Sequence, residues 1–193
     1  MFKVRIHGRG GQGVVTAAEI LSVAAFDEGK HAQAFPSFGS ERTGAPVVSF
    51  CRISDRPIKV HEPIAEPDAL IIQDPTLLHQ VKVFEGAGPM AYILINSSRG
   101  LADLGLDDEL TKRPPGHLIT LPATDLARKY AGRPVPNAAL LGGFAAMTDV
   151  VSLEAVVDAI RQRFSGAVGE GNVEAAEAAF ALAKRAAKGT VDA

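Results

Sequence analysis

The first thirty residues combine two hydrophobic periods. Phe2, Val4 and Ile6 alternate with polar residues, which is the period of a half-buried strand. From Val14 onward, apolar residues recur at helical spacing and end near Gly29. Four glycines lie between the two patterns. The N-terminal pattern therefore predicts a strand, a glycine turn and a helix.

The next stretch predicts strands without an intervening helix. Residues 31–35 indicate a short strand, and residues 36–46 are too rich in Gly, Pro and Ser for regular structure. Residues 47–53 and 58–60 are interpreted as a hairpin with residues 54–57 as its turn. Because a hairpin interrupts the alternation of strands and helices, we expect a mixed sheet.

The rest of the chain returns to that alternation. Residues 69–73 predict a buried strand, followed by Asp74 as an N-cap and Pro75 in the first turn of a short helix. Further elements are expected as strands at 91–96 and 117–121 and as helices at 124–130, 137–147, 152–164 and from Asn172, as cap, to Lys188.

Composition is consistent with one layered domain. With 193 residues, two Tyr and no Trp, the chain can bury a core in which small side chains bring helices close to a sheet. Gly142 and Gly143 each cost about 1 kcal/mol inside a helix, so we infer a close neighbour there. We predict an α/β fold, a single three-layer α/β/α domain with a mixed, mostly parallel sheet over residues 1–188. Residues 189–193 are expected to be a frayed C-terminus.

Charge and cysteine content exclude several classes of protein. The 20 basic and 22 acidic residues are scattered, which predicts no nucleic-acid partner, and no apolar run approaches the roughly 20 residues of a membrane span. Cys51 is the only cysteine, so a disulfide, a four-thiolate cluster or a zinc ribbon cannot be built from this chain alone. We expect Cys51 to be half-buried and inert. The N-terminus lacks a signal-peptide pattern, and we expect a cytoplasmic protein.

Catalytic patterns are sparse. No serine lies in a G-x-S-x-G motif, and the histidines show no metal-ligand spacing. We therefore predict no catalytic and no metal-binding residue, and expect each histidine at a strand end or on the surface. The five histidines are His7, His31, His61, His79 and His117.

The glycine turn, residues 8–13, satisfies G-x-G-x-x-G between a strand and a helix. A dinucleotide site also needs an acidic residue at the end of the second strand, but Asp27 and Glu28 fall at the end of the helix. This argues against NAD or FAD. Two readings stay open, a tight strand-to-helix turn and a contact with an anion or ligand. In either case we expect Gly10 or Gly13 to have positive φ or to lie against another backbone.

A second candidate is the loop of residues 35–46, which contains Phe35, Phe38, Glu41 and Arg42. It is either a solvated surface loop or a binding loop at the carboxyl ends of the strands. Two phenylalanines in an exposed loop favour burial against a partner or ligand.

Together these residues suggest a family. The segments HGRGGQG, QAFPSFGSERTGAPV, EPDALIIQDPTLL, PVPNAALLGGFA and VSLEAVVDAIRQRF occur in this order between about residues 2 and 181. The chain closely resembles the gamma subunit of the 2-oxoacid:ferredoxin oxidoreductases, of the pyruvate synthase type.

The resemblance implies a division of labour. In that family, alpha and beta subunits hold thiamine diphosphate with Mg²⁺ and decarboxylate a 2-oxoacid, [4Fe–4S] clusters in partner subunits such as a ferredoxin-like delta subunit carry electrons, and CoA accepts the acyl group. The acceptor is ferredoxin or, through a flavin subunit, NAD. The resemblance implies a gamma unit that packs on the thiamine-binding core and helps to shape the CoA side of the site. This implies no cofactor held by the present chain alone.

The resemblance also implies where this chain contacts CoA or its partners. The implied residues are Gly8, Gly10, Gly11, Gln12 and Gly13 in the turn and Ser40, Glu41, Arg42 and Thr43 in the loop. The 2-oxoacid stays open among pyruvate, branched-chain, 2-oxoglutarate and aryl types such as phenylglyoxylate. The competing hypotheses are a self-sufficient nucleotide-binding enzyme that uses residues 8–13 and a stand-alone interaction module.

Overall fold

The computed structural model describes residues 1–37 and 43–189. In these residues one six-stranded sheet has the order β2-β3-β1-β4-β5-β6. Strands β1, β4, β5 and β6 run parallel, while β3 is antiparallel to both β1 and β2. The strands are β1 (Phe2–Arg9), β2 (His31–Pro36), β3 (Pro46–Ser54), β4 (Ala69–Ile72), β5 (Tyr92–Asn96) and β6 (Leu118–Leu121). The prediction of a mixed, mostly parallel sheet is confirmed.

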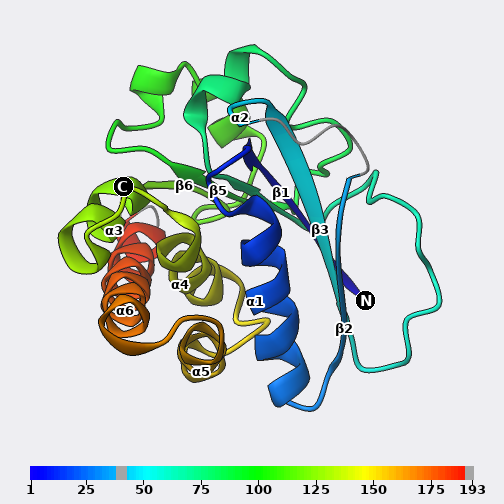
Figure 1. Cartoon of the computed structure of the whole chain (residues 1–193). Helices are drawn as coiled ribbons and strands as arrows, with labels where there is room; N and C mark the ends of the chain where they lie inside the picture. The colour runs from blue at the N-terminus through cyan, green and yellow to red at the C-terminus, as the bar shows by residue number, and fades with distance from the viewer. Residues whose placement is uncertain (38–42, 190–193) are drawn as a thin grey trace.

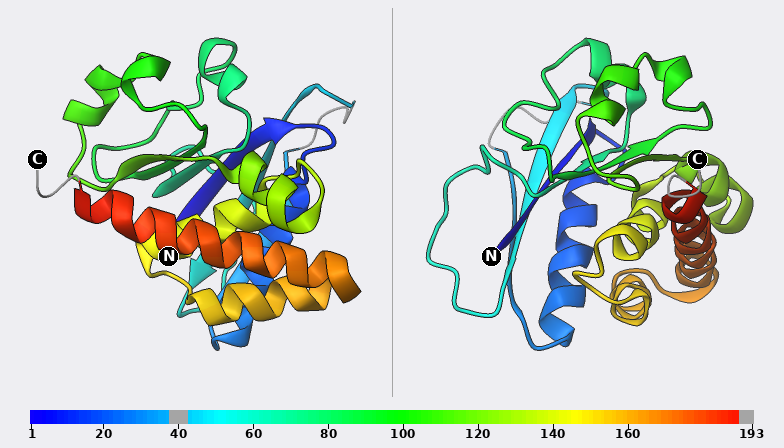
Figure 2. Two further views of the ribbon diagram at one scale, coloured as in Figure 1. Left: turned by 90° about the vertical axis from the view of Figure 1, so that its left-hand side faces the viewer. Right: turned by 180° about the vertical axis from the view of Figure 1, so that it is seen from behind.

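Helices cover both faces of the sheet unequally (Figure 1). The longer helices pack together on one face, and Figure 2 shows α6 running across that layer. They are α1 (Val14–Asp27), α3 (Ala123–Ala131), α4 (Asn137–Thr148), α5 (Leu153–Arg163) and α6 (Gly166–Gly189). The other face is covered by the short elements η1 (Pro75–His79), η2 (Ala102–Leu104) and α2 (Asp107–Thr111). The α/β fold is therefore as predicted, although η2 and α2 were not predicted.

The core has two parts because strand side chains alternate between the faces. In β4, Ile71 belongs to the large cluster under the long helices, whereas Leu70 and Ile72 belong to the smaller cluster under the short ones. All three are buried. This two-sided burial explains why β4 and β5 read as continuous apolar runs.

The glycine pair in α4 lies at close contacts, as inferred. A Cβ on Gly142 would stand 2.0 Å from the carbonyl oxygen of Ala176 in α6. A Cβ on Gly143 would stand 2.4 Å from Cδ1 of Leu121 in β6. The two glycines thus let α4 approach a helix on one side and the sheet on the other.

The predicted hairpin of residues 47–53 and 58–60 is wrong. Residues 58–60 form no strand, and β3 pairs with β2 on one side and with β1 on the other. Because both edges of β3 are occupied, no edge is left to which residues 58–60 could bind. The antiparallel partners of β3 are two strands that precede it, β1 and β2, and not the segment that follows it.

Asn172 does not cap the last helix. Helix α6 begins six residues earlier, at Gly166, and Asn172 is buried inside it with its Nδ2 donating to the carbonyl of Val168. Gly169 and Gly171 lower the helix propensity here, but a Cβ on Gly171 would lie 2.5 Å from the carbonyl of Tyr130. Close packing thus overrides propensity.

Two further expectations concern the end of the chain and membranes. Of the expected frayed residues 189–193, all but Gly189, the last residue of α6, lie outside the described residues. None of the helices within residues 1–37 and 43–189 combines the length and the apolar character that a membrane crossing requires.

Candidate functional site at the carboxyl edge of the sheet

The glycine turn lies where β1 ends and α1 begins. Gly11 and Gly13 have φ of 93° and 71°, in the left-handed region that favours glycine. A Cβ on Gly13 would also stand 2.6 Å from Nδ2 of Asn137 at the start of α4. The expectation for Gly10 or Gly13 is confirmed at Gly13.

Gly8 has a different reason to be glycine. Its φ is ordinary, but a Cβ there would lie 2.6 Å from Cγ2 of Val14 and 3.2 Å from Cβ of Gln73. The end of β1 is therefore packed against both the first residue of α1 and the residue after β4. This close packing supports the reading of the motif as a tight strand-to-helix turn.

The same turn also borders open space. A cavity of about 550 Å³ lies at the opposite edge of the sheet, whereas one of about 260 Å³ is lined by Arg9, Gly10, Gly11, Gly13, Val47 and residues 14–16. The N–H groups in the first turn of an α-helix have no intrahelical partner, and no side chain in the described part of the chain caps α1. Such N–H groups, together with the helix dipole, favour an anion. The structure thus joins the tight turn with a surface suited to an anionic group.

The larger cavity has several ionisable side chains in its walls but lies far from the glycine turn. Its walls include Lys3, Asp68 and Met90, and the stacked rings of Tyr92 and His117, whose centroids are 4.0 Å apart. It lies at the amino ends of the parallel strands, away from the helix N-terminus and the glycine turn. We therefore take the smaller cavity as the candidate site, since open α/β sheets bind ligands at the carboxyl ends of their strands.

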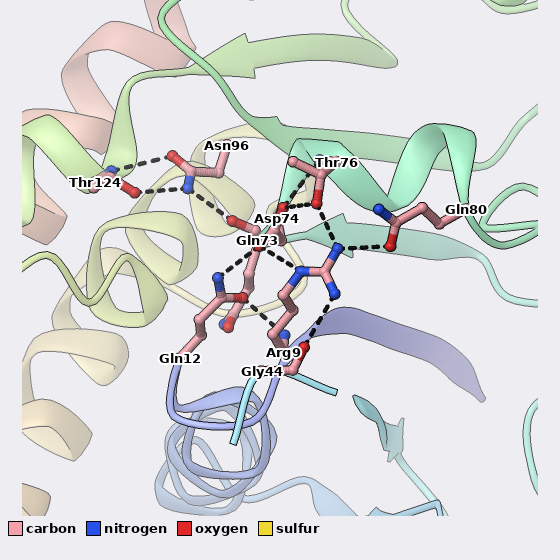
Figure 3. Close-up of polar contacts among 9 residues, drawn as sticks. All are labelled: Arg9, Gln12, Gly44, Gln73, Asp74, Thr76, Gln80, Asn96 and Thr124. Carbon is pink, nitrogen blue, oxygen red and sulfur yellow. Dashed lines mark hydrogen bonds and ion pairs between the residues drawn. The ribbon is translucent and has the colours of Figure 1, made fainter. Parts of the chain in front are cut away.

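Asp74 gathers the polar groups beside the turn (Figure 3). Its Oδ2 accepts hydrogen bonds from Nε2 of Gln12 at 2.8 Å and from Nε of Arg9 at 3.1 Å, and its Oδ1 accepts from the backbone N–H of Thr76 at 2.9 Å. Gln12 in turn accepts from the backbone N–H of Arg9 through Oε1, at 2.8 Å. Asp74 caps η1, as predicted, and also ties η1 to the glycine turn.

These contacts decide the charge state of Asp74. Partial burial alone would raise its pKa, but hydrogen bonds from Thr76 and Gln12 and the charge of Arg9 outweigh it and lower the pKa below the ordinary value. Asp74 is therefore ionised at neutral pH. Asp74 is a structural anion, because both of its carboxylate oxygens already accept hydrogen bonds within the chain.

Polar side chains at the ends of β4 and β5 also lie at the carboxyl edge of the sheet. Nδ2 of Asn96 donates to the carbonyl of Gln73 and to Oγ1 of Thr124, both at 2.8 Å, and its Oδ1 accepts from the N–H of Thr124. The side chain of Gln73 is buried, and neither of its amide atoms has a partner among the described residues. Sequence reasoning missed this group, although Gln73 and Asn96 are the polar residues that close two apolar strands.

The predicted binding loop is described only at its ends. Ser40, Glu41 and Arg42, like Phe38, lie outside the described residues. Thr43 is exposed and forms an isolated bridge with Gly10, which places the end of the loop beside the turn.

Phe35 was expected both at the end of a strand, residues 31–35, and in an exposed loop, residues 35–46. The strand is confirmed, and the placement of Phe35 in the loop is wrong. Phe35 lies in β2, where its ring packs on Phe50 with centroids 5.0 Å apart and beneath the guanidinium of Arg52. Phe35 belongs to the sheet because β2 extends to Pro36. It is therefore no evidence for a partner-binding loop.

The remaining candidate groups are not arranged for catalysis. His7 is buried in β1 rather than on the surface, and burial together with the charge of Arg5 lowers its pKa to about 4. Cys51 is fully rather than half buried, and burial raises the pKa of its thiol to about 12. Within the described part of the chain, no three His, Cys, Asp or Glu side chains gather as a metal site would require.

Comparisons with known proteins extend over nearly the whole chain. The family model described as pyruvate ferredoxin/flavodoxin oxidoreductase matches residues 3–182. "Pyruvate/ketoisovalerate oxidoreductases common subunit gamma" from Thermococcus kodakarensis is 47% identical over 180 residues, which cover 93% of this chain and 96% of the relative. Pyruvate synthase subunit PorC from Methanocaldococcus jannaschii is 46% identical with the same coverage. The crystal structure of pyruvate oxidoreductase subunit PORC from Thermotoga maritima matches with a TM-score of 0.77 and 32% identity, covering 93% of this chain and 95% of that protein.

Proposed function

Because this chain belongs to the pyruvate ferredoxin/flavodoxin oxidoreductase family, we infer that it is the gamma subunit of a complex that oxidises a 2-oxoacid. In the proposed reaction the 2-oxoacid loses CO₂, two electrons pass to an acceptor, and the acyl carbon forms a thioester with the sulfur of CoA, which releases its proton. The resemblance to gamma subunits over nearly the full length carries this proposal.

In this proposal the chain lines the CoA side of the site and performs no chemical step. The surface that supports it is the carboxyl edge, where the glycine turn and the N-terminus of α1, which no described side chain caps, border a cavity of about 260 Å³. CoA carries phosphate groups, and N–H groups at a helix N-terminus bind such anions without a charged side chain. Gly10, Gly11, Gly13 and Thr43 are the described residues that we place nearest to CoA or to a partner subunit.

We place the cofactors in the partner subunits. Thiamine diphosphate with Mg²⁺ would activate the 2-oxoacid there, and [4Fe–4S] clusters would carry its electrons to ferredoxin or, through a flavin subunit, to NAD. The residues of this chain do not fit a cluster, since its one thiol is buried with a strongly raised pKa. The alpha, beta and ferredoxin-like delta subunits are the proposed partners.

In this proposal the partner subunits, and not this chain, determine which 2-oxoacid the complex uses. The relative from Thermococcus kodakarensis is named as a subunit common to pyruvate and ketoisovalerate oxidoreductases. One gamma subunit that serves two enzymes is consistent with a role at the CoA side, because CoA is the part of the reaction that both would share. We propose that the present chain works with pyruvate and is indifferent to the 2-oxoacid side chain.

The test is reconstitution of the complex with and without this chain. Acyl-CoA formation from pyruvate is measured beside the exchange of CO₂ into the 2-oxoacid, which does not need CoA to be acylated. We expect omission of the chain to abolish acyl-CoA formation. In the assembled complex, Gly13→Val should raise the KM for CoA about tenfold, because a β-branched residue is strained at positive φ and collides with Asn137.

Two results would overturn the proposal. Undiminished acyl-CoA synthesis without the chain would remove it from the enzyme. Micromolar binding of NAD to the isolated chain, measured by calorimetry, would instead favour the nucleotide-binding hypothesis raised by the G-x-G-x-x-G motif.

A further inference from the structure

One guanidinium joins three separate segments at the carboxyl edge. Arg9 is the last residue of β1, and its Nη1 donates to the carbonyl of Gly44 at 3.0 Å. Its Nε donates to Oδ2 of Asp74 at 3.1 Å. Its Nη2 donates to Oγ1 of Thr76 and to Oε1 of Gln80, each at 2.7 Å. Figure 3 shows the guanidinium between Gly44 on one side and the segment of residues 74–80 on the other.

Both backbone polar groups of Gly44 are held by hydrogen bonds. Its N–H donates to the carbonyl of Gly10 at 3.1 Å, and the N–H of Gly10 donates to the carbonyl of Ala45 at 2.9 Å. Gly44 is exposed, has φ of 82°, and has no atom of residues 1–37 or 43–189 within 4 Å of the position that a Cβ would take. Its N–H is thus fixed by Gly10 and its carbonyl by Arg9, with no side chain to pack.

The charge of Arg9 is not free for a ligand. All three guanidinium nitrogens donate hydrogen bonds within the chain, and the ion pair with Asp74 neutralises the charge. The side chains of Arg9 and Asp74 are 21% and 13% exposed, so the pair is partly buried and solvent screens it less than an ion pair on the open surface. The planar, forked guanidinium of Arg9 holds acceptors on three sides in a fixed arrangement, which the single ammonium of a lysine cannot do.

We propose that Arg9 is a positioning residue that fixes residues 43–45, which lead into β3, beside the glycine turn. Held in this way, the two segments form one continuous binding edge next to the first turn of α1. This inference rests on the proposed function of that edge in the use of CoA. Neither the glycine motif nor the family resemblance assigns this role to Arg9.

The test uses Arg9→Lys and Arg9→Ala in the assembled complex. Hydrogen exchange of the Gly44 amide reports on its bond to Gly10, and steady-state kinetics separate the KM for CoA from the kcat of the decarboxylating half-reaction. We expect exchange at Gly44 to become about tenfold faster and the KM for CoA to rise about tenfold, as loss of a charge-assisted hydrogen bond predicts. The kcat of the half-reaction should stay unchanged.

Arg128→Ala is the matched control. Arg128 also pairs with an aspartate, Asp125, but on the exposed surface of α3, and its loss should change neither readout. If the Arg9 variants do not assemble, Gln80→Met removes one acceptor of the fork and should speed exchange at Gly44 about threefold.

Each outcome decides one part of the inference. Unchanged exchange at Gly44 in the Arg9 variants, or in Gln80→Met, would overturn the positioning role. Faster exchange with an unchanged KM for CoA would leave Arg9 as the group that holds Gly44, but would remove this edge from the path of CoA and so contradict the proposed function.

Discussion

Arg5 and His7 form a buried hydrogen-bonded pair on β1, with Nε of Arg5 donating to Nε2 of His7 at 3.0 Å. This contact requires the neutral ring with its proton on Nδ1. The other nitrogens of Arg5 donate to backbone carbonyls of two loops that cover the sheet; these are Ile64, Ala65, Val83 and Glu85. Protonation of His7 would remove the acceptor of Nε and place two positive charges side by side in the sheet.

The first prediction is that protonation of His7 destabilises the fold. The pKa of His7 is about 4 in the folded chain, against about 6.5 in an unfolded one, so the unfolded state binds a proton first. Above about pH 6.5, His7 therefore does not lower the free energy of unfolding. As the pH falls below this value, the free energy of unfolding declines, by about 3 kcal/mol near pH 4.

His7→Gln separates this effect from the titration of carboxylates. The variant keeps an acceptor for Arg5 but cannot be protonated in this range. Urea unfolding of the isolated chain at several pH values should show a smaller decline in the free energy of unfolding for His7→Gln than for the parent. Parallel pH dependence of the two proteins would contradict the predicted shift.

Much of the fold could be predicted because local and global signals agree. Residues 69–73 predicted a buried strand, and Asp74 its helix cap, since burial on both faces and capping chemistry leave direct traces in the sequence. The false strand at residues 58–60 has the correct alternation, but its pairing depended on which edge of β3 was free. Strand pairing between distant segments has no such local signal.

The second prediction concerns the crossing of α4 and α6. Gly142→Ala should destabilise the isolated chain by about 2 kcal/mol, because its Cβ would collide with the carbonyl of Ala176 and the better helix propensity of alanine offsets only about 1 kcal/mol. Gly88→Ala is the control, since no atom lies within 4 Å of that position. Chemical unfolding measures both. Equal stability of the two variants would show that the crossing can relax.

The candidate site was less predictable than the fold. The glycine turn was visible because only glycine tolerates its backbone, but the role of Arg9 depends on acceptors that lie 35 to 71 residues away. Gln73 gave no signal, since a glutamine after a strand is unremarkable until its burial is known.

The third prediction is that Cys51 does not react in the folded chain. It is buried in β3, and burial raises the pKa of its thiol to about 12, so almost no thiolate exists near neutral pH. A disulfide reagent added to the native chain should label it only at the rate of unfolding. The same reagent in denaturant should label one thiol per chain at once. Rapid labelling of the native protein would show that β3 opens locally.

The last prediction contrasts two buried amides at the same edge. Gln73 is 1% exposed with both amide atoms unpaired among the described residues, whereas Asn96 is 7% exposed and makes three hydrogen bonds. A buried polar group without a partner costs about 1–3 kcal/mol, so Gln73→Met should stabilise the isolated chain by about 1 kcal/mol.

Asn96→Leu also replaces a buried amide by an apolar side chain of similar size, but it should lower the stability of the isolated chain. It leaves the carbonyl of Gln73 and the N–H of Thr124 without partners, so we expect a loss of about 2–3 kcal/mol. Urea unfolding of the parent and both variants gives the signs. A loss of stability in Gln73→Met would mean that its amide is already hydrogen-bonded in solution. A gain would mean that this amide is retained at a cost to the isolated chain, at the edge where we place CoA and the partner subunits.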